Sequence, residues 1–300
     1  MARNKNSLVV RAEYALAATL LATLRYAPLF LGERIAYAAA RLLDFAAPKL
    51  RRVAFANLGF AFPGALPAER SVIIDGVFRT VGRMLLMLAR FPDLTESNIR
   101  DWISYEGLEH YLAAKRQGRG ILIATAHVGN WELSAFAHAL MTEPMNVMVR
   151  PLDNPLIDAV VESRRTLSAN KLIYKWEGAR AVLRALKNNE AVGILIDQNT
   201  SSAEGVFVNF FGKLACANTA FVRLAYHAKA PVIPGFAVWD RATRRYVLHF
   251  YPPLPLTGNE QSDTQQLHSI LESIVRAYPD QWMWIHRRWK TRPPGEPPLY

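Results

Sequence analysis

The chain has 300 residues, of which 51% are hydrophobic and 20% are charged, and its formal net charge is +11. A chain of this length can bury a large core, as one big domain or as one domain with an appendage. The hydrophobic fraction is too low for a polytopic membrane protein, and the excess positive charge indicates an anionic partner such as nucleic acid, membrane headgroups, or an acidic protein or ligand. A single cysteine, Cys216, excludes an internal disulfide framework and a cysteine zinc cluster.

The first predicted element is an apolar run over residues 14–31, in which Arg25 is the only charge. Its length is slightly below the roughly 20 residues needed to span a bilayer. Residues 35–47 continue as an amphipathic stretch, which basic residues follow. A single span, an interfacial helix and a core helix of a soluble domain all fit this pattern. We expect residues 1–50 to form a hydrophobic anchor with an amphipathic helix, and residues 51–300 to form the catalytic domain.

Hydrophobic spacing next predicts a helix over residues 68–91, which ends at Pro92. A shorter helix over residues 107–117 leads into the first clear strand, residues 121–126. Beyond it, short apolar runs alternate with helical segments. The candidate strands are residues 146–149, 171–175, 192–196, 232–238 and 246–250. The candidate helices are residues 130–141, 155–169, 178–188, 218–227 and 264–278.

Such alternation is typical of an α/β fold in which helices cover a central sheet. The run at residues 192–196 is apolar on both faces, as a strand inside a covered sheet should be. We therefore expect a mixed, largely parallel sheet flanked by helices, with a hydrophobic, membrane-anchoring helix at the N-terminus.

His127 stands where the strand over residues 121–126 ends, and Glu132 follows five residues later. Within a helix, five residues rotate the chain by about 140°, so the two side chains can converge only if His127 precedes the helix. Gly129 and Asn130 supply a break and a capping residue at that point. The pair would then be a general base oriented by an acid. A capping or core histidine is the alternative interpretation.

Polar residues also follow other predicted strands, at the carboxyl edge where open α/β sheets bind ligands. Arg150 follows one strand and could stabilise an acyl oxyanion or bind a phosphate, although a surface salt bridge is an alternative. Asp197 and Gln198 follow another strand, where Asp197 could also cap a turn. Arg287 and Arg288 belong to a basic, tryptophan-rich cluster of a kind that binds phosphates, headgroups or bases.

Three common catalytic motifs are absent from the sequence. It has no phosphate-cradling glycine loop, no G-x-S-x-G elbow and no H-E-x-x-H motif. These absences disfavour nucleotide hydrolysis, serine hydrolysis of the α/β type and zinc proteolysis.

Five segments, in order, resemble the bacterial lipid A biosynthesis acyltransferases, the late lauroyl and myristoyl transferases. The first, H-V-G-N-W-E at residues 127–132, resembles the H-x-x-x-x-[D/E] signature of glycerolipid-type acyltransferases. The other four are R-P-L-D-N-P at 150–155, V-G-I-L-I-D-Q at 192–198, V-F-V-N-F-F-G at 206–212 and W-I-H-R-R-W-K at 284–290. The resemblance covers nearly the whole chain, although Asn209 stands where the family usually has proline.

This resemblance implies transfer of a fatty acyl chain to a hydroxyl of a lipid A precursor, a phosphorylated glycolipid. His127 would deprotonate the hydroxyl that attacks the donor thioester, and Glu132 would orient the imidazole. The donor would be acyl carrier protein or acyl-CoA, with no metal or organic cofactor. The expected oxyanion-stabilising or substrate-binding residues are Arg150, Asn154, Asp197, Gln198, Arg287 and Arg288. The enzyme would act at the bacterial inner membrane surface with its catalytic domain in the cytoplasm, and would not bind nucleic acid.

Two alternatives stay open. The acceptor could be another lipid, such as a glycerophospholipid, an amino-lipid or a phosphoinositol mannoside, because enzymes acting on these share the histidine and acid. The chain could instead be a non-catalytic basic protein that binds membranes or nucleic acid. That reading leaves the context of His127 and the polar strand end at Asp197 and Gln198 unexplained.

Overall fold

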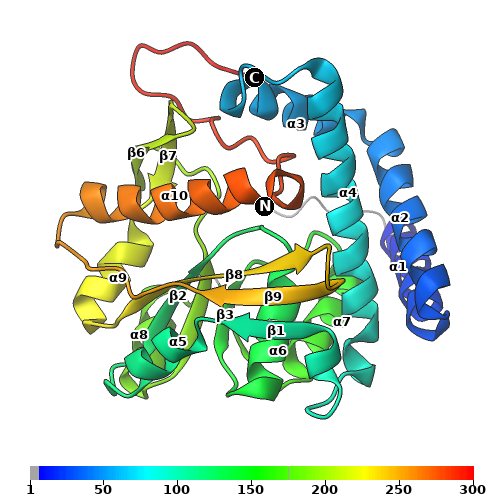
Figure 1. Cartoon of the computed structure of the whole chain (residues 1–300), viewed down its shortest axis with the longest axis horizontal. Coiled ribbons are helices and arrows are strands. Elements are labelled where there is room, and N and C mark those ends of the chain that lie inside the picture. Colours follow the sequence, from blue (N-terminus) through cyan, green and yellow to red (C-terminus); the bar gives the residue numbers. More distant parts are fainter. Residues whose placement is uncertain (1–6, 175) are drawn as a thin grey trace.

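A seven-stranded β-sheet organises the fold, which the computed structural model describes for residues 7–174 and 176–300 (Figure 1). Its strands are β1 (Ile103–Glu106), β2 (Ile121–Thr125), β3 (Asn146–Val149), β4 (Lys171–Tyr174), β5 (Ala191–Leu195), β8 (Val232–Asp240) and β9 (Arg245–Phe250). They lie in the order β1-β9-β8-β2-β5-β3-β4. Neighbours pair in parallel except β8 and β9, which are antiparallel. The predicted α/β class with a largely parallel, mixed sheet is confirmed.

Helices cover both faces of this sheet (Figure 1). They are α1 (Ser7–Tyr26), α2 (Leu29–Ala46), α3 (Pro48–Ala61), α4 (Pro67–Arg90), α5 (Leu108–Lys115), α6 (Trp131–Met141), α7 (Pro155–Thr166), α8 (Gly178–Lys187), α9 (Ala220–Ala228) and α10 (Glu260–Ala277). Successive residues of β2 face opposite sides, as the pleat of a strand requires. Ile121 and Ile123 pack in one apolar cluster with Phe136 of α6, whereas Leu122 packs in another with Val182 of α8.

Two short strands outside the main sheet, β6 (Gly205–Phe210) and β7 (Lys213–Asn218), form an antiparallel hairpin. Phe211 and Gly212 make its turn, and both have positive φ, as a type I′ hairpin turn requires. The sequence pattern did not predict this hairpin or β1. In β1 only Ile103 is buried, so hydrophobic patterning gives that strand almost no signal.

The predicted apolar run over residues 14–31 is divided between two helices. α1 ends at Tyr26 and α2 begins at Leu29, with Pro28 between them. Proline disfavours a helical conformation in the residue before it, which explains the break. The predicted domain boundary at residue 50 falls inside α3.

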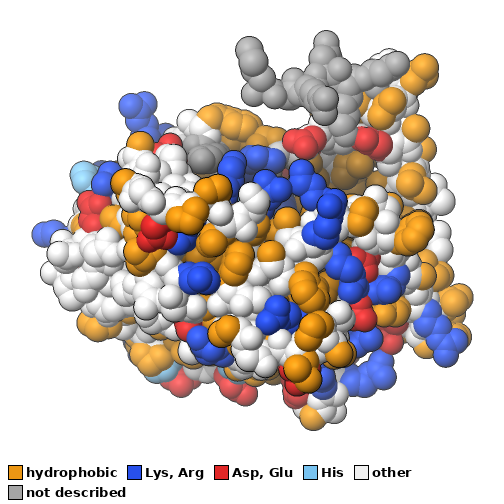
Figure 2. Space-filling view, turned by 90° about the horizontal axis from the view of Figure 1, so that it is seen from above, with side chains coloured by type: hydrophobic (Ala, Val, Ile, Leu, Met, Phe, Trp, Pro, Cys, Tyr) orange, Lys and Arg blue, Asp and Glu red, His pale blue; other side chains and the backbone are white. Residues whose placement is uncertain are grey.

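Positive charge is prominent on one face of the surface. Figure 2 shows Lys and Arg side chains grouped among hydrophobic ones on the face seen from above Figure 1, with Asp and Glu fewer there. An anionic partner is therefore compatible with this face as well as with the total charge.

Candidate active site

Adjacent parallel strands bring two polar loops together at the carboxyl edge of the sheet. β2 pairs with β5 so that Thr125 lies opposite Leu195, and the Ile196 amide donates a 2.9 Å hydrogen bond to the Thr125 carbonyl. His127 follows the end of β2 and Asp197 follows the end of β5. Because the strands run side by side, the two residues leave the sheet at the same point.

His127 and Asp197 form a hydrogen-bonded pair. The imidazole Nδ1 lies 2.8 Å from Asp197 Oδ1, and the His127 amide donates to Oδ2 at 3.0 Å. The indole Nε1 of Trp282 donates to the same Oδ2 at 2.8 Å. A carboxylate accepts only, so Nδ1 carries the proton, and Nε2 of the neutral ring holds the lone pair that can accept another.

The electrostatics of the pair favour its charged form. Burial alone would raise the pKa of Asp197, but the charge of His127 and the hydrogen bonds from His127 and Trp282 lower that pKa well below its ordinary value. Burial also opposes protonation of His127, but the charge and hydrogen bond of Asp197, with a smaller attraction from Glu132, raise its pKa above 6.5. The site thus stabilises an imidazolium, the form that a general base adopts after it takes a proton.

Glu132 has a different partner from the expected one. It lies in the first turn of α6, and Arg165 of α7 binds its carboxylate through Nε at 2.8 Å and Nη2 at 2.5 Å. Among the described residues, the imidazole of His127 is hydrogen-bonded to Asp197 rather than to Glu132. Asn130 caps α6 by accepting from the Leu133 amide, so the helix begins beyond His127 and directs Glu132 toward α7. The sequence analysis did not single out Arg165.

Asn154 joins two helices. Its side-chain oxygen caps α7 by accepting from the Leu156 and Ile157 amides, and its Nδ2 donates to the Val10 carbonyl and to Glu13 Oε2 of α1. These contacts are structural, so the expected substrate-binding role of Asn154 stays a prediction.

The other predicted residues of this edge point into solvent. The side chain of Arg150 is 79% exposed and lies 3.9 Å from Asp153, which is the surface salt bridge that the sequence left open. Gln198 is exposed beside the buried Asp197.

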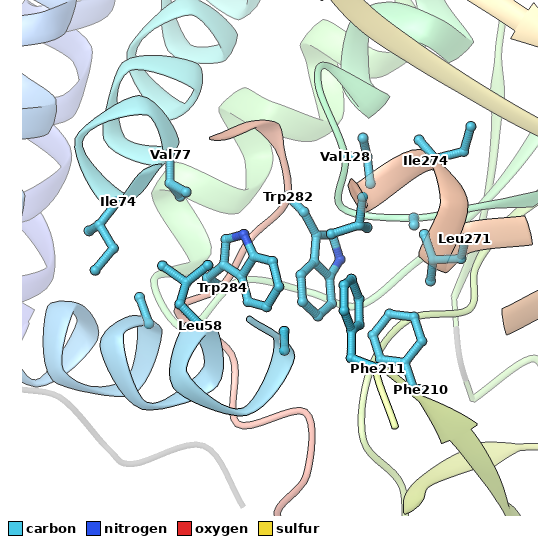
Figure 3. Packing of buried hydrophobic residues seen from close by; sticks show 14 of the residues in the cluster. Leu58, Ile74, Val77, Val128, Phe210, Phe211, Leu271, Ile274, Trp282 and Trp284 are labelled. Atoms are coloured by element: carbon cyan, nitrogen blue, oxygen red, sulfur yellow. The ribbon is translucent and has the colours of Figure 1, made fainter. Parts of the chain in front are cut away.

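The tryptophan-rich C-terminal segment is part of the core rather than of an exposed ligand site. Figure 3 shows Trp282 and Trp284 between α3 and α4 on one side and α10 on the other, beside Phe210. Arg288 is fully buried, donates to the Cys216 carbonyl at 2.6 Å and lies over the Phe210 ring, and burial lowers its pKa to about 10. The sequence could not separate a buried aromatic cluster from an exposed one, since composition is the same in both.

Arg287 and His286 of this segment are partly buried. The guanidinium of Arg287 lies 5.6 Å from the centre of the Tyr300 ring. His286 Nε2 accepts a 3.0 Å hydrogen bond from the Asn199 amide, which ties the segment to the loop after β5.

A mainly apolar cavity of about 40 Å³ lies between α6 and the sheet. Thr125, Leu195 and Trp131 line it near the carboxyl edge of the sheet, and the ring centroid of Trp131 is 4.8 Å from that of His127. Met145 and Gly193 also line it. The cavity therefore lies next to the His127–Asp197 pair. Within the described residues, no group of three or more His, Cys, Asp or Glu is placed to hold a metal ion.

Comparisons of the sequence with known proteins point to one enzyme family. The family model for bacterial lipid A biosynthesis acyltransferases matches residues 2–291. The lipid A biosynthesis palmitoleoyltransferase of Escherichia coli is 30% identical over 90% of this chain and 87% of its own length. The E. coli lauroyltransferase is 30% identical over 83% and 82%, and a lipid A biosynthesis acyltransferase of Haemophilus influenzae is 27% identical over 83% and 79%.

These relatives show that this α/β protein is an acyltransferase. The chain belongs to the bacterial lipid A biosynthesis acyltransferase family.

Proposed function

We propose that this enzyme transfers a fatty acyl chain from a thioester, carried by acyl carrier protein or CoA, to a hydroxyl of a lipid A precursor. The observation that carries the proposal is the His127 ring, held through Nδ1 by the buried Asp197 and placed beside an apolar cavity. A fixed base next to an apolar cavity is what acyl transfer needs, since one substrate gives up a proton and the other is a hydrocarbon chain.

The proposed reaction has two steps. Nε2 of His127 removes the proton of the acceptor hydroxyl while its oxygen attacks the thioester carbonyl and forms a tetrahedral intermediate. The intermediate collapses, the C–S bond breaks, and the imidazolium returns its proton to the leaving sulfur. Asp197 keeps Nδ1 protonated and stabilises the imidazolium throughout.

Glu132 has a supporting role in this proposal. Its carboxylate contributes to the raised pKa of His127 and holds the first turn of α6 against α7 through Arg165. It is not the group that orients the ring. The expected pairing of His127 with Glu132 is therefore replaced here by His127 with Asp197.

Substrate binding follows from the surroundings of the pair. In this proposal the start of the acyl chain would lie at this cavity, which at about 40 Å³ is too small to hold the whole chain and would have to widen on binding. Arg150, Gln198 and Arg287 are at least partly exposed and could bind phosphates of the glycolipid or of the donor. The basic face in Figure 2 suits both an acidic carrier protein and an anionic lipid surface. We place the enzyme at the inner membrane, with its catalytic domain in the cytoplasm.

The direct test is acyl transfer by His127→Ala in vitro, with acyl carrier protein and CoA thioesters compared as donors and a lipid A precursor as acceptor. We expect turnover to fall about 10²–10⁴-fold, the usual contribution of a general base. His227→Ala is the matched control, because His227 is exposed on α9. Near wild-type turnover of a folded His127→Ala protein would contradict the mechanism.

The acceptor is tested separately by mass spectrometry of total lipids from cells with and without the gene. A lipid A species lacking one acyl group is the expected result. An unacylated glycerophospholipid, amino-lipid or mannoside would assign a different acceptor to the same chemistry.

A further inference from the structure

Among the described residues, one helix, α1, is long and apolar enough to cross a membrane. Its 20 residues make a rod of about 30 Å, which matches the hydrocarbon thickness of a bilayer. Length and composition therefore allow a transmembrane helix. The contacts of α1 with the rest of the protein argue against it.

Both ends of α1 are bound to the catalytic domain. Near its start, Asn154 Nδ2 donates to the Val10 carbonyl at 3.0 Å and to Glu13 Oε2 at 2.9 Å. Near its end, Arg25 Nη2 lies 2.7 Å from Asp93 Oδ1, and Arg25 Nε contacts both oxygens of that carboxylate at 3.1 Å. The second half of α1 also packs on α4, in an apolar cluster that contains Leu21, Leu24, Leu86 and Ala89.

A helix held near both ends cannot enter the bilayer alone and keep these contacts. α4 and α7, which lie against α1 (Figure 1), would have to enter with it. The charged residues of α7 are Asp158, Glu162, Arg164 and Arg165. Each charge at the bilayer centre costs roughly 2.5–3.5 kcal/mol or more. A spanning α1 would therefore have to separate from the domain and lose the contacts at both ends.

The outward face of α1 is nonetheless suited to lipid. Residues three or four positions apart form one exposed face without charge, namely Val9, Ala12, Leu16, Thr19, Thr23 and Tyr26. Leu16 is 74% and Tyr26 76% exposed, and Phe30 and Phe45 of the neighbouring α2 are 63% and 85% exposed. Soluble proteins rarely expose so many apolar side chains side by side. Basic residues accompany this surface, with Arg11, Arg34 and Lys49 exposed, as anionic headgroups would require.

We propose that α1 is an in-plane helix that stays docked on the catalytic domain and embeds its outward face in one leaflet, without crossing the membrane. The occupant of this surface is the anionic cytoplasmic leaflet. The inference rests on the proposed membrane location of the enzyme. Asn154 belongs to the segment that follows β3, so the docked helix also brings the leaflet to the active-site edge of the sheet.

The test is the sidedness of the two ends of α1. In a Cys216→Ser background, single cysteines are introduced as Ser7→Cys, Tyr26→Cys and, as a marker of the catalytic domain, Asn188→Cys. Each variant is treated with a membrane-impermeant maleimide in intact spheroplasts and in inverted inner-membrane vesicles. We expect none of the three cysteines to react in spheroplasts. In inverted vesicles positions 7 and 188 should react directly, whereas position 26, which belongs to the outward face, should react only after detergent is added.

Labelling of position 7 or 26 in spheroplasts overturns the proposal, because one end would then lie on the far side. Position 7 reacting only after detergent is added also overturns it, since the start of the helix would then lie inside the bilayer. Direct reaction of position 26 in inverted vesicles overturns it as well, because the outward face would then not be embedded. The readout does not depend on turnover. A failure of the acyltransferase proposal and a failure of this one are thus distinguishable.

Discussion

Asp197 carries the most weight at the scale of single residues, since its carboxylate holds His127 through both the ring and the amide. In Asp197→Asn the amide can present its NH₂ group to Nδ1, which favours the wrong tautomer of the imidazole. A comparable change in serine proteases costs about 10⁴ in turnover. We expect Asp197→Asn to lower kcat at least 100-fold with little change in KM, measured by steady-state acyl transfer.

The pH dependence gives a second readout of the same pair. His127 must be neutral to act as a base, and its raised pKa places the acid limb of the kcat/KM profile above 6.5. Loss of the Asp197 charge lowers the pKa of His127, so the limb should move to lower pH in Asp197→Asn. In Glu132→Gln the shift should be smaller. A larger shift in Glu132→Gln would return the orienting role to Glu132.

The residues of this site were predictable from the sequence, whereas their pairing was not. His127 and Asp197 both follow apolar strands, so the sequence placed them at one edge. Asp197 reaches His127 because β5 lies next to β2 in the sheet. That strand order is set by packing between segments far apart in the sequence. Glu132 is closer than Asp197 to His127 in the sequence, but it is Asp197 that forms the hydrogen bond with the His127 ring.

At the scale of elements, the turn between β2 and α6 depends on Gly129. Its φ is +59°, and a Cβ there would lie 1.9 Å from the Ala237 carbonyl oxygen of β8. We expect Gly129→Ala to destabilise the protein by several kcal/mol and to abolish activity, because strand β8 or the turn must move.

Gly118→Ala is the matched control for that variant. Gly118 has a similar φ of +70°, but nothing lies within 4 Å of its Cβ position. Gly118→Ala should lose only about 1–2 kcal/mol of stability, the cost of placing a Cβ in the left-handed region. Urea unfolding of the two variants tests the difference, and equal losses would show that close packing at Gly129 is unimportant.

The proposed binding of the acyl chain at the apolar cavity makes a prediction on chain length. A Cβ at Gly193 would lie 2.8 Å from Met145 Cε, so Gly193→Val should fill part of the cavity. We expect kcat/KM to fall most for the longest acyl donors and least for the shortest. A uniform fall across a donor series would mean that the acyl chain binds elsewhere or that the fold is damaged.

Helices and strands were predicted best where the hydrophobic pattern was continuous over the whole element. The predicted helix over residues 68–91 is α4, and the predicted strand over residues 121–126 is β2. The β6–β7 hairpin was missed because its aromatic run packs against α10 and the C-terminal tryptophans, which hydrophobic periodicity does not encode.

For the whole molecule, the docked position of α1 changes what an N-terminal deletion would mean. Removal of residues 1–34 should release the protein from membranes, but it also uncovers Leu86 and Ala89 and takes away the α1 partners of Asn154. Loss of activity in such a deletion would therefore not separate anchoring from folding.

A point substitution on the outward face avoids this problem. Leu16→Glu places a charge at a 74% exposed position and leaves the packed side intact. We expect binding to anionic vesicles, measured by flotation, to fall about tenfold or more, because the buried leucine is lost and the new negative charge is unfavourable at the membrane. The unfolding midpoint should not change.

Leu112→Glu, at a 39% exposed position on α5, is the control and should bind normally. Equal binding of Leu16→Glu and wild type would remove this face from the membrane contact.

The contact of Trp282 with the Asp197 carboxylate has a consequence for biosynthesis. Helices α1 and α2 are translated before the indole that donates to Asp197 and before the Met283 amide that donates to the His127 carbonyl. If α1 and α2 bind the membrane as proposed, a nascent chain can reach it before the His127–Asp197 pair has all its partners.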